Sequence, residues 1–114
     1  MAKTDAYHVP AEDMPLAVCD ATSRDQRDFI PTDLIFEHRA GEIYSVVYNP
    51  EQRWFYCPRM QPGEVMLLKC YDSIEDGRAR FTAHSAFVDP AVPTGGPARA
   101  SLAARTFAFF APKA

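Results

Sequence analysis

The run Arg78-Ala79-Arg80-Phe81-Thr82-Ala83-His84-Ser85-Ala86-Phe87 decides the fold class of this chain. Side chains alternate along it with a period of two, which is typical of a β-strand whose two faces meet different surroundings. One side carries Phe81, Ala83, Ser85 and Phe87, and the other carries Arg80, Thr82, His84 and Ala86. We therefore predict a strand over residues 78–87.

The stretches on either side also have strand character. Apolar and aromatic runs separated by turn residues predict strands at residues 15–20, 42–48, 53–57, 64–71 and 99–111. Residues 49–52 have turn chemistry, so we expect residues 42–48 and 53–57 to form a hairpin. The charged residues 22–31 predict a loop or one helical turn, and the apolar run that follows them is expected to end at a turn at Ala40-Gly41.

These elements define one domain. Several short strands without an amphipathic helix indicate an all-β sandwich or jelly roll. At 114 residues the chain is long enough for one domain at most. We place the domain at residues 15–111, after a flexible lead-in at residues 1–14 and before a tail at residues 112–114.

Composition excludes several classes of function. The net charge is −3 and the basic residues are scattered, which argues against a nucleic-acid partner. No apolar run approaches the roughly 20 residues that cross a bilayer. The three cysteines lack a C-x-x-C spacing, and the polar N-terminus does not resemble a signal peptide. A reduced, cytoplasmic location is the expectation.

The closing strand carries the first candidate binding residues. Its period places Arg99, Ser101 and Arg105 on one face. A guanidinium that points into a barrel needs an anionic partner, and Arg99 could grip a carboxylate while Ser101 donates a further hydrogen bond. The same face could instead lie in water on an exposed edge. Both interpretations stay open on the pattern alone.

His84 is the candidate metal ligand. A non-haem Fe(II) site needs two histidines and one carboxylate, and an early His-x-Asp or His-x-Glu normally supplies two of them. Neither His8 nor His38 has an acidic residue two positions later, so the chain offers a single ligand. Four residues near His84 and one on the closing strand are weaker candidates for lining a pocket: Lys69, Tyr71, Asp72, Arg80 and Arg105.

Several blocks of the sequence are similar to one family. They are Pro15-Leu16-Ala17-Val18-Cys19-Asp20, Pro31-Thr32-Asp33-Leu34, Gly41-Glu42-Ile43-Tyr44, Lys69-Cys70-Tyr71-Asp72-Ser73 and Ala79-Arg80-Phe81-Thr82-Ala83-His84. Together they resemble the C-terminal part of the CmcJ/AsaB-like hydroxylase/desaturase family, which includes a cephem-methoxylase component. The resemblance implies the C-terminal half of a double-stranded β-helix, or jelly roll. It also implies Fe(II)- and 2-oxoglutarate-dependent oxidation of small molecules in secondary metabolism.

Within that resemblance, His84 matches the last iron ligand, and Arg99 with Ser101 matches the site for the co-substrate carboxylate. The family carries an upstream His-Asn-Asp-Tyr segment for its other ligands, and nothing in this sequence matches it. We therefore expect the C-terminal portion of an oxidoreductase that is inactive alone and does not necessarily hold the cofactors by itself. The missing half would be a separate chain, or the protein would self-associate.

A second hypothesis is a non-catalytic domain that binds a small anion or acts as an accessory subunit. A methyltransferase label has also been attached to the family, and no motif in this sequence supports methyl transfer.

Overall fold

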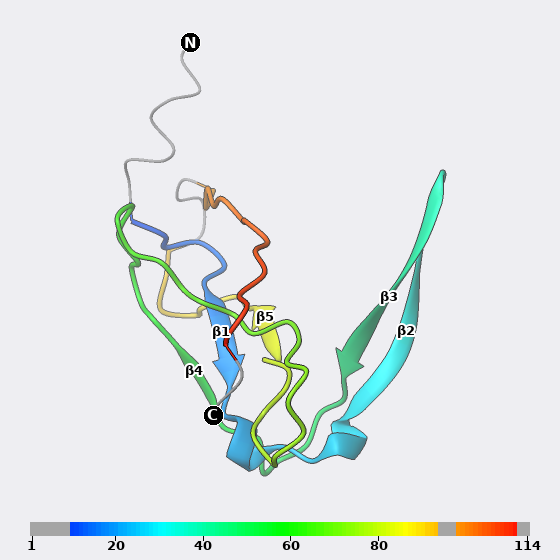
Figure 1. The fold of residues 1–114 in the computed structure, drawn as a ribbon. Helices are drawn as coiled ribbons and strands as arrows, with labels where there is room; N and C mark the ends of the chain where they lie inside the picture. Colours follow the sequence, from blue (N-terminus) through cyan, green and yellow to red (C-terminus); the bar gives the residue numbers. More distant parts are fainter. Residues whose placement is uncertain (1–9, 94–97, 112–114) are drawn as a thin grey trace.

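The computed structural model describes residues 10–93 and 98–111. Within these ranges the chain forms strands and two short 3-10 turns, and no helix is long and apolar enough to cross a bilayer. The elements are β1 (Leu16–Cys19), η2 (Ala21–Ser23), η3 (Gln26–Asp28), β2 (Phe29–Phe36), β3 (Arg39–Val46), β4 (Trp54–Tyr56) and β5 (His84–Ala86). They form two antiparallel sheets, β4-β1-β5 and β2-β3 (Figure 1). The predicted all-β class is confirmed.

The hairpin lies earlier in the chain than expected. β2 pairs with β3 along its whole length, from Phe29 opposite Val46 to Phe36 opposite Arg39. The turn therefore falls at residues 37–38, and the predicted turn at Ala40-Gly41 is wrong. Two residues suffice to join antiparallel strands, so β3 folds back on the strand immediately before it.

The predicted pairing of residues 42–48 with 53–57 is also wrong. β3 already has β2 as its neighbour, so the chain continues past it and β4 pairs with β1, with Tyr56 opposite Ala17. The expected turn at residues 49–52 does form, since the amide of Gln52 donates to the carbonyl of Asn49 at 3.1 Å. That turn carries the chain from one sheet to the other (Figure 1).

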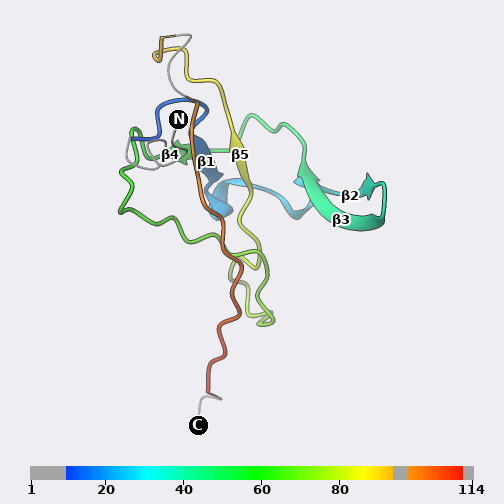
Figure 2. The same ribbon diagram turned by 90° about the horizontal axis from the view of Figure 1, so that it is seen from above.

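Fewer strands form in the second half than the sequence predicts. Of residues 78–87 only His84–Ala86 is a strand, and residues 64–71 and 98–111 form none. A strand needs a neighbouring strand with which it forms a ladder of main-chain hydrogen bonds. These segments make too few such hydrogen bonds to count as strands. Figure 2 shows residues 98–111 running outward, away from the three-stranded sheet. The expected closing strand is therefore absent from the described residues.

A small aromatic cluster joins the two sheets. Cys19, Phe29 and Ala83 form the buried core, with Phe81 packed against it. The ring of Phe81 lies 6.2 Å from that of Phe29 and 5.4 Å from that of Tyr44, both on the hairpin. Burial of Ala83 and packing of Phe81 agree with the face predicted from the alternation. The cluster holds the β2–β3 hairpin against the segment that leads into β5.

Aspartates organise the charged loop, which contains two helical turns where one was expected. Asp20 accepts from the amide of Thr22 at 2.8 Å and caps η2. Asp28 is buried and accepts hydrogen bonds from Gln52 Nε2 and the amide of Asp25, each at 3.0 Å, which lower the pKa of its carboxyl. Asp28 thus ties the loop to the segment before β4 through Gln52, and Asp20 does the same by accepting a hydrogen bond from Arg53 at 2.6 Å.

Part of the expected lead-in contacts the domain. The amide of Ala11 donates to the carbonyl of Met60 at 2.9 Å, and Glu12 pairs with Arg59 at 3.0 Å. Residues 1–9 and the expected tail at residues 112–114 lie outside the described residues.

Candidate functional site

His84 is held in one orientation by the residue two positions before it. His84 belongs to β5, an edge strand of the three-stranded sheet, and it lies opposite Val18 of β1. Its side chain is exposed. Its Nδ1 is 2.8 Å from the carbonyl oxygen of Thr82. Because that oxygen can only accept, Nδ1 carries the proton and Nε2 of the neutral ring is left with its lone pair. Metal-binding histidines are commonly oriented by such a bond.

Thr82 also connects two segments that the sequence predicted as strands. Its amide donates to the carbonyl of Lys69 at 2.7 Å, and the amide of Lys69 donates to Thr82 Oγ1 at 3.0 Å. The Thr82 hydroxyl thus takes the place of a main-chain carbonyl as the acceptor for the Lys69 amide. The ladder of main-chain hydrogen bonds between the two segments therefore does not continue beyond this pair. Sequence reasoning missed this role of Thr82, although its position on the same face as His84 was a usable signal.

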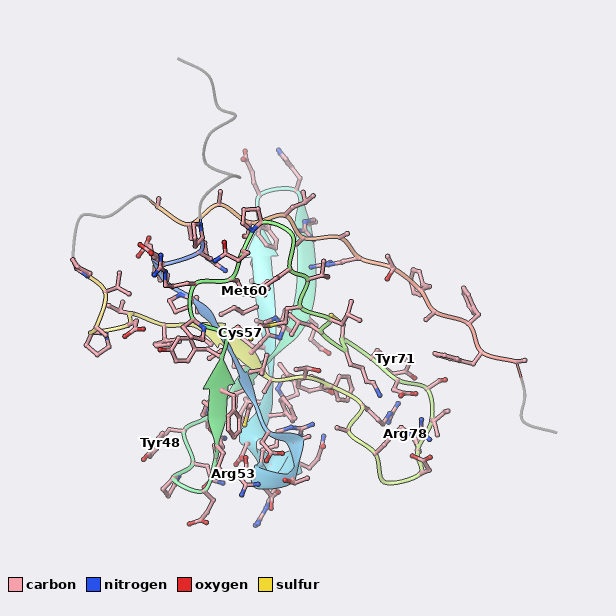
Figure 3. The ribbon with its side chains drawn as sticks, turned by 90° about the vertical axis from the view of Figure 1, so that its left-hand side faces the viewer. Tyr48, Arg53, Cys57, Met60, Tyr71 and Arg78 are labelled. Carbon is pink, nitrogen blue, oxygen red and sulfur yellow. The ribbon has the colours of Figure 1, made fainter. Side chains whose placement is uncertain are left out.

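Four of the five weaker candidates lie together. Arg80 donates from Nε to the carbonyl of Asp72 at 2.7 Å, and its guanidinium lies 5.1 Å from the centre of the Tyr71 ring. Lys69 pairs with the Asp72 carboxylate at 2.7 Å, which lowers the pKa of that carboxyl. Arg80 Nη1 also reaches Glu75 at 2.6 Å. Both cations are therefore already neutralised, and Figure 3 shows Tyr71 and Arg78 on this outlying part of the chain.

The proposed co-substrate residues lie on the segment that forms no strand. Arg99 is half-buried, whereas Ser101 and Arg105 are exposed. Within residues 10–93 and 98–111, no hydrogen bond or ion pair joins these three to His84 or to the Arg80 group. The predicted role of Arg99 and Ser101 in binding a carboxylate, and the weaker prediction that Arg105 lines the pocket, stay predictions.

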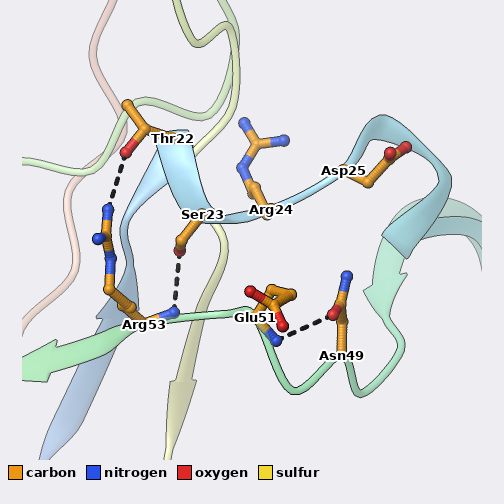
Figure 4. A pocket seen from close by; sticks show the side chains of 7 residues that line it. All are labelled: Thr22, Ser23, Arg24, Asp25, Asn49, Glu51 and Arg53. Atoms are coloured by element: carbon orange, nitrogen blue, oxygen red, sulfur yellow. Dashed lines mark hydrogen bonds between the residues drawn. The ribbon is translucent and has the colours of Figure 1, made fainter.

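A shallow polar hollow lies between the charged loop and the turn before β4 (Figure 4). Its lining consists of Thr22, Ser23, Arg24, Asp25, Asn49, Glu51 and Arg53. Arg53 donates to Thr22 Oγ1 at 3.1 Å and to the carboxylate of Asp20 at 2.6 Å, while its amide donates to Ser23 Oγ at 2.9 Å. Hydrogen bonds from Thr22 and Arg53 lower the pKa of Asp20. We assign this hollow a structural role.

The described residues do not form a complete iron site. No group of three histidine, cysteine, aspartate or glutamate side chains converges within the part of the chain that the structure describes. His84 fits as one ligand, because its Nε2 is available and its ring is oriented. A facial Fe(II) site needs two further protein ligands, so Fe(II) would require residues beyond those described.

Comparison with known proteins identifies the family. The family model described as "Oxidoreductase/YMDC permease-like domain" matches residues 6–109. The chain belongs to this family.

Two relatives of this chain are named hydroxylase/desaturases. Hydroxylase/desaturase asaB of Aspergillus flavus is 40% identical over 110 residues, which cover 84% of this chain and 48% of that protein. Hydroxylase/desaturase efuI of Hormonema carpetanum is 39% identical over 107 residues, covering 84% of this chain and 36% of that protein. The resemblance drawn from the sequence is confirmed.

A solved structure gives the same result for the fold. The iron and alpha-ketoglutarate-dependent endoperoxidase NvfI superposes with a TM-score of 0.69 at 31% identity, over 78% of this chain and 33% of the endoperoxidase. The expected partial jelly roll is thus confirmed as the fold class. The chain spans less than half the length of the relatives it matches.

Proposed function

We propose that this chain is the C-terminal portion of a non-haem Fe(II)/2-oxoglutarate-type oxidoreductase, a hydroxylase or desaturase of small molecules in secondary metabolism. The carrying observation is the oriented imidazole of His84, with Nδ1 bonded to Thr82 at 2.8 Å, inside the segment shared with such enzymes. Iron supplies the activation of oxygen in these enzymes. In this chain His84 would hold the metal, and Arg99 with Ser101 would hold the co-substrate carboxylate.

We further propose that the chain is inactive alone. His84 is the only metal ligand that the sequence pattern assigns, and the described residues contain no three-ligand group. Residues outside the described part, in a longer form of this chain or in a second polypeptide, would have to supply the other two ligands. The three cysteines are free thiols, which supports a reduced, cytoplasmic location as part of the same proposal.

The test joins residues 10–111 to the N-terminal part of the Aspergillus flavus relative that this chain does not match. With Fe(II) and 2-oxoglutarate, the joined protein is expected to release succinate, whereas the chain alone releases none. His84→Ala should abolish the release. His38→Ala is the matched control, because His38 lies at the exposed tip of the hairpin. Full activity of the His84→Ala variant would overturn the proposal.

The absence of a three-ligand group in the described residues favours a second candidate, a non-catalytic domain that binds a small anion. Calorimetry of the chain alone with 2-oxoglutarate and no metal distinguishes the two. Under this second candidate Arg99→Ala abolishes binding, while His84→Ala and the control Arg78→Ala leave it unchanged. No binding to the parent chain would reject this candidate.

A further inference from the structure

The strand that carries His84 is short and lies at the edge of its sheet. Among the described residues β5 pairs with β1 alone, so one of its two sides has no neighbouring strand (Figure 1). At one end of β5 the amide of Cys19 donates to the carbonyl of Ala83 at 2.9 Å. At the other end the amide of Phe87 donates to the carbonyl of Pro15 at 3.3 Å. A ladder this short opens readily from its ends, so the position of His84 depends on what holds those ends.

Tyr56 reaches the end of β5 from the opposite edge of the sheet. Residues directly opposite one another in an antiparallel pair share a face. The register therefore places Tyr56 of β4, Ala17 of β1 and Ser85 of β5 in one row. Phe87 lies two residues beyond Ser85, and its ring meets that of Tyr56 edge-on, with the ring centres 4.9 Å apart. Because β4 and β5 both pair with β1, this contact joins the two edge strands across the central one.

The hydroxyl of Tyr56 adds a directional contact just beyond β5. It donates to Asp89 Oδ2 at 3.0 Å. Asp89 Oδ1 accepts from the amide of Ala91 at 2.9 Å, and the carbonyl of Asp89 accepts from the amide of Val92 at 3.1 Å. The hydrogen bond to Asp89 and the charge of its carboxylate raise the pKa of Tyr56, so the hydroxyl keeps the proton that it donates. Asp89 thus closes the turn after β5 and ties that turn to β4.

These contacts lie on the face of the sheet away from the imidazole. Val18 stands opposite both Phe55 and His84, so these three residues share the other face. Tyr56 therefore does not touch a metal held by His84. Any effect of Tyr56 on the histidine passes through the main chain of β5.

We propose that Tyr56 is a positioning residue for His84. Through Asp89 and Phe87 it holds the end of β5 against β1, and so fixes where the imidazole stands. The carbonyl of Thr82 sets which ring nitrogen carries the proton, whereas Tyr56 sets the place of the strand. The consequence for a bound metal rests on the proposed function, and the effect on β5 does not.

The test is amide hydrogen exchange of the full chain, followed by NMR, in Tyr56→Phe, which keeps the ring and removes only the hydroxyl. Exchange of the Phe87 amide is expected to accelerate about fivefold, the equivalent of one net hydrogen bond, while the Cys19 amide at the other end of β5 keeps its rate. Tyr48→Phe is the matched control, because Tyr48 is 88% exposed, and both rates should stay unchanged in it. In an Asp89→Ala background, Tyr56→Phe should cause no further acceleration.

Two results of the exchange experiment would overturn the proposal. One is a Phe87 amide that is unprotected in the parent chain or unaffected by Tyr56→Phe. The other is equal acceleration at Cys19 and Phe87, because the lost hydroxyl would then loosen the whole sheet and not the end of β5. Far-UV circular dichroism of each variant reports whether the fold is kept.

Binding of Mn(II) to the joined protein tests the consequence for the metal. Tyr56→Phe is expected to weaken binding by about threefold to fivefold, since one net hydrogen bond is lost, and Tyr48→Phe should leave it unchanged. Unchanged affinity in Tyr56→Phe, beside faster exchange at Phe87, would overturn the positioning of His84. A parent joined protein that binds no Mn(II) counts against the proposed function, and the exchange rates then decide the proposal.

Discussion

Nδ1 of His84 lies 2.8 Å from the carbonyl oxygen of Thr82, so the chain orients this imidazole with its own main chain two residues away. The orientation does not depend on the side chain of Thr82, whose hydroxyl is engaged by the amide of Lys69. One residue thus fixes the histidine through its carbonyl and the neighbouring segment through its hydroxyl. The two contacts can be separated by experiment.

The neutral form of His84 is predicted to be the Nδ1–H tautomer. The carbonyl of Thr82 stabilises this form, which leaves Nε2 unprotonated. Two-bond ¹H–¹⁵N correlation spectra at about pH 8 measure the tautomer directly. His38, whose ring nitrogen has only a distant carboxylate neighbour at 3.9 Å, serves as the internal reference. A His84 signal with the proton on Nε2 would contradict the orientation.

Thr82→Val is predicted to release the segment at Lys69 without changing the tautomer of His84. The valine keeps the carbonyl that binds Nδ1 but loses the Oγ1 that accepts from the Lys69 amide. Hydrogen exchange of that amide should accelerate about fivefold, since its net hydrogen bond is worth about 1 kcal/mol. Thr106→Val, on the segment that forms no strand, is the control. Unaltered exchange of the Lys69 amide in Thr82→Val would refute its hydrogen bond to Thr82 Oγ1.

The sequence predicted those features that depend on residues close together in the chain. It did not predict which strands pair, because that depends on residues far apart in the chain. The alternation around Ala83 and His84 agrees with the structure at these two residues, since Ala83 is buried and His84 is exposed, but not at Ser85, which is exposed although it shares the face of Ala83. Pairing depends on which strand lies alongside. Gly41 suggested a turn, yet the turn fell at Glu37 and His38, which carry no glycine signal.

The candidate site was predictable in part for the same reason. Lys69, Tyr71, Asp72 and Arg80 are close in sequence and do lie together. Arg99 and Ser101 were expected to approach His84 only through a closing strand, and that strand has no neighbour among the described residues. The capping role of Asp20 was missed because Asp20 ends a predicted strand, and the capping role of Asp25 was hidden in a run of charges that resembled an ordinary loop.

Phe81→Ala is predicted to weaken the attachment of the hairpin. Phe81 packs against Phe29 and Tyr44 and is half-buried, so removing its ring should cost about 2 kcal/mol in the free energy of unfolding. Phe107→Ala is the control of the same residue type. Phe107 is 91% exposed, and its loss should change the unfolding free energy by less than about 0.5 kcal/mol. Urea denaturation gives both values, and equal effects would argue against the cluster.

Acid is predicted to destabilise the chain through the charged loop. Hydrogen bonds from the side chain and amide of Arg27 lower the pKa of Asp25 from 3.8 to about 2. A lowered pKa means that the ionised carboxyl stabilises the folded state above 3.8, and that this contribution is lost as the pH falls towards 2. Asp25→Asn should therefore flatten the fall in urea midpoint over this range. Glu37→Gln at the hairpin tip should keep the parent slope, and an identical slope in Asp25→Asn would contradict the assignment.

Binding of Mn(II) to the joined protein tests most directly the claim that His84 is a metal ligand. Electron paramagnetic resonance follows the loss of the free Mn(II) signal during titration, without any requirement for turnover. The account predicts one Mn(II) per chain, with affinity lowered by about 100-fold or more in His84→Ala and unchanged in His38→Ala. Equal affinity of the His84→Ala variant and the parent would contradict it.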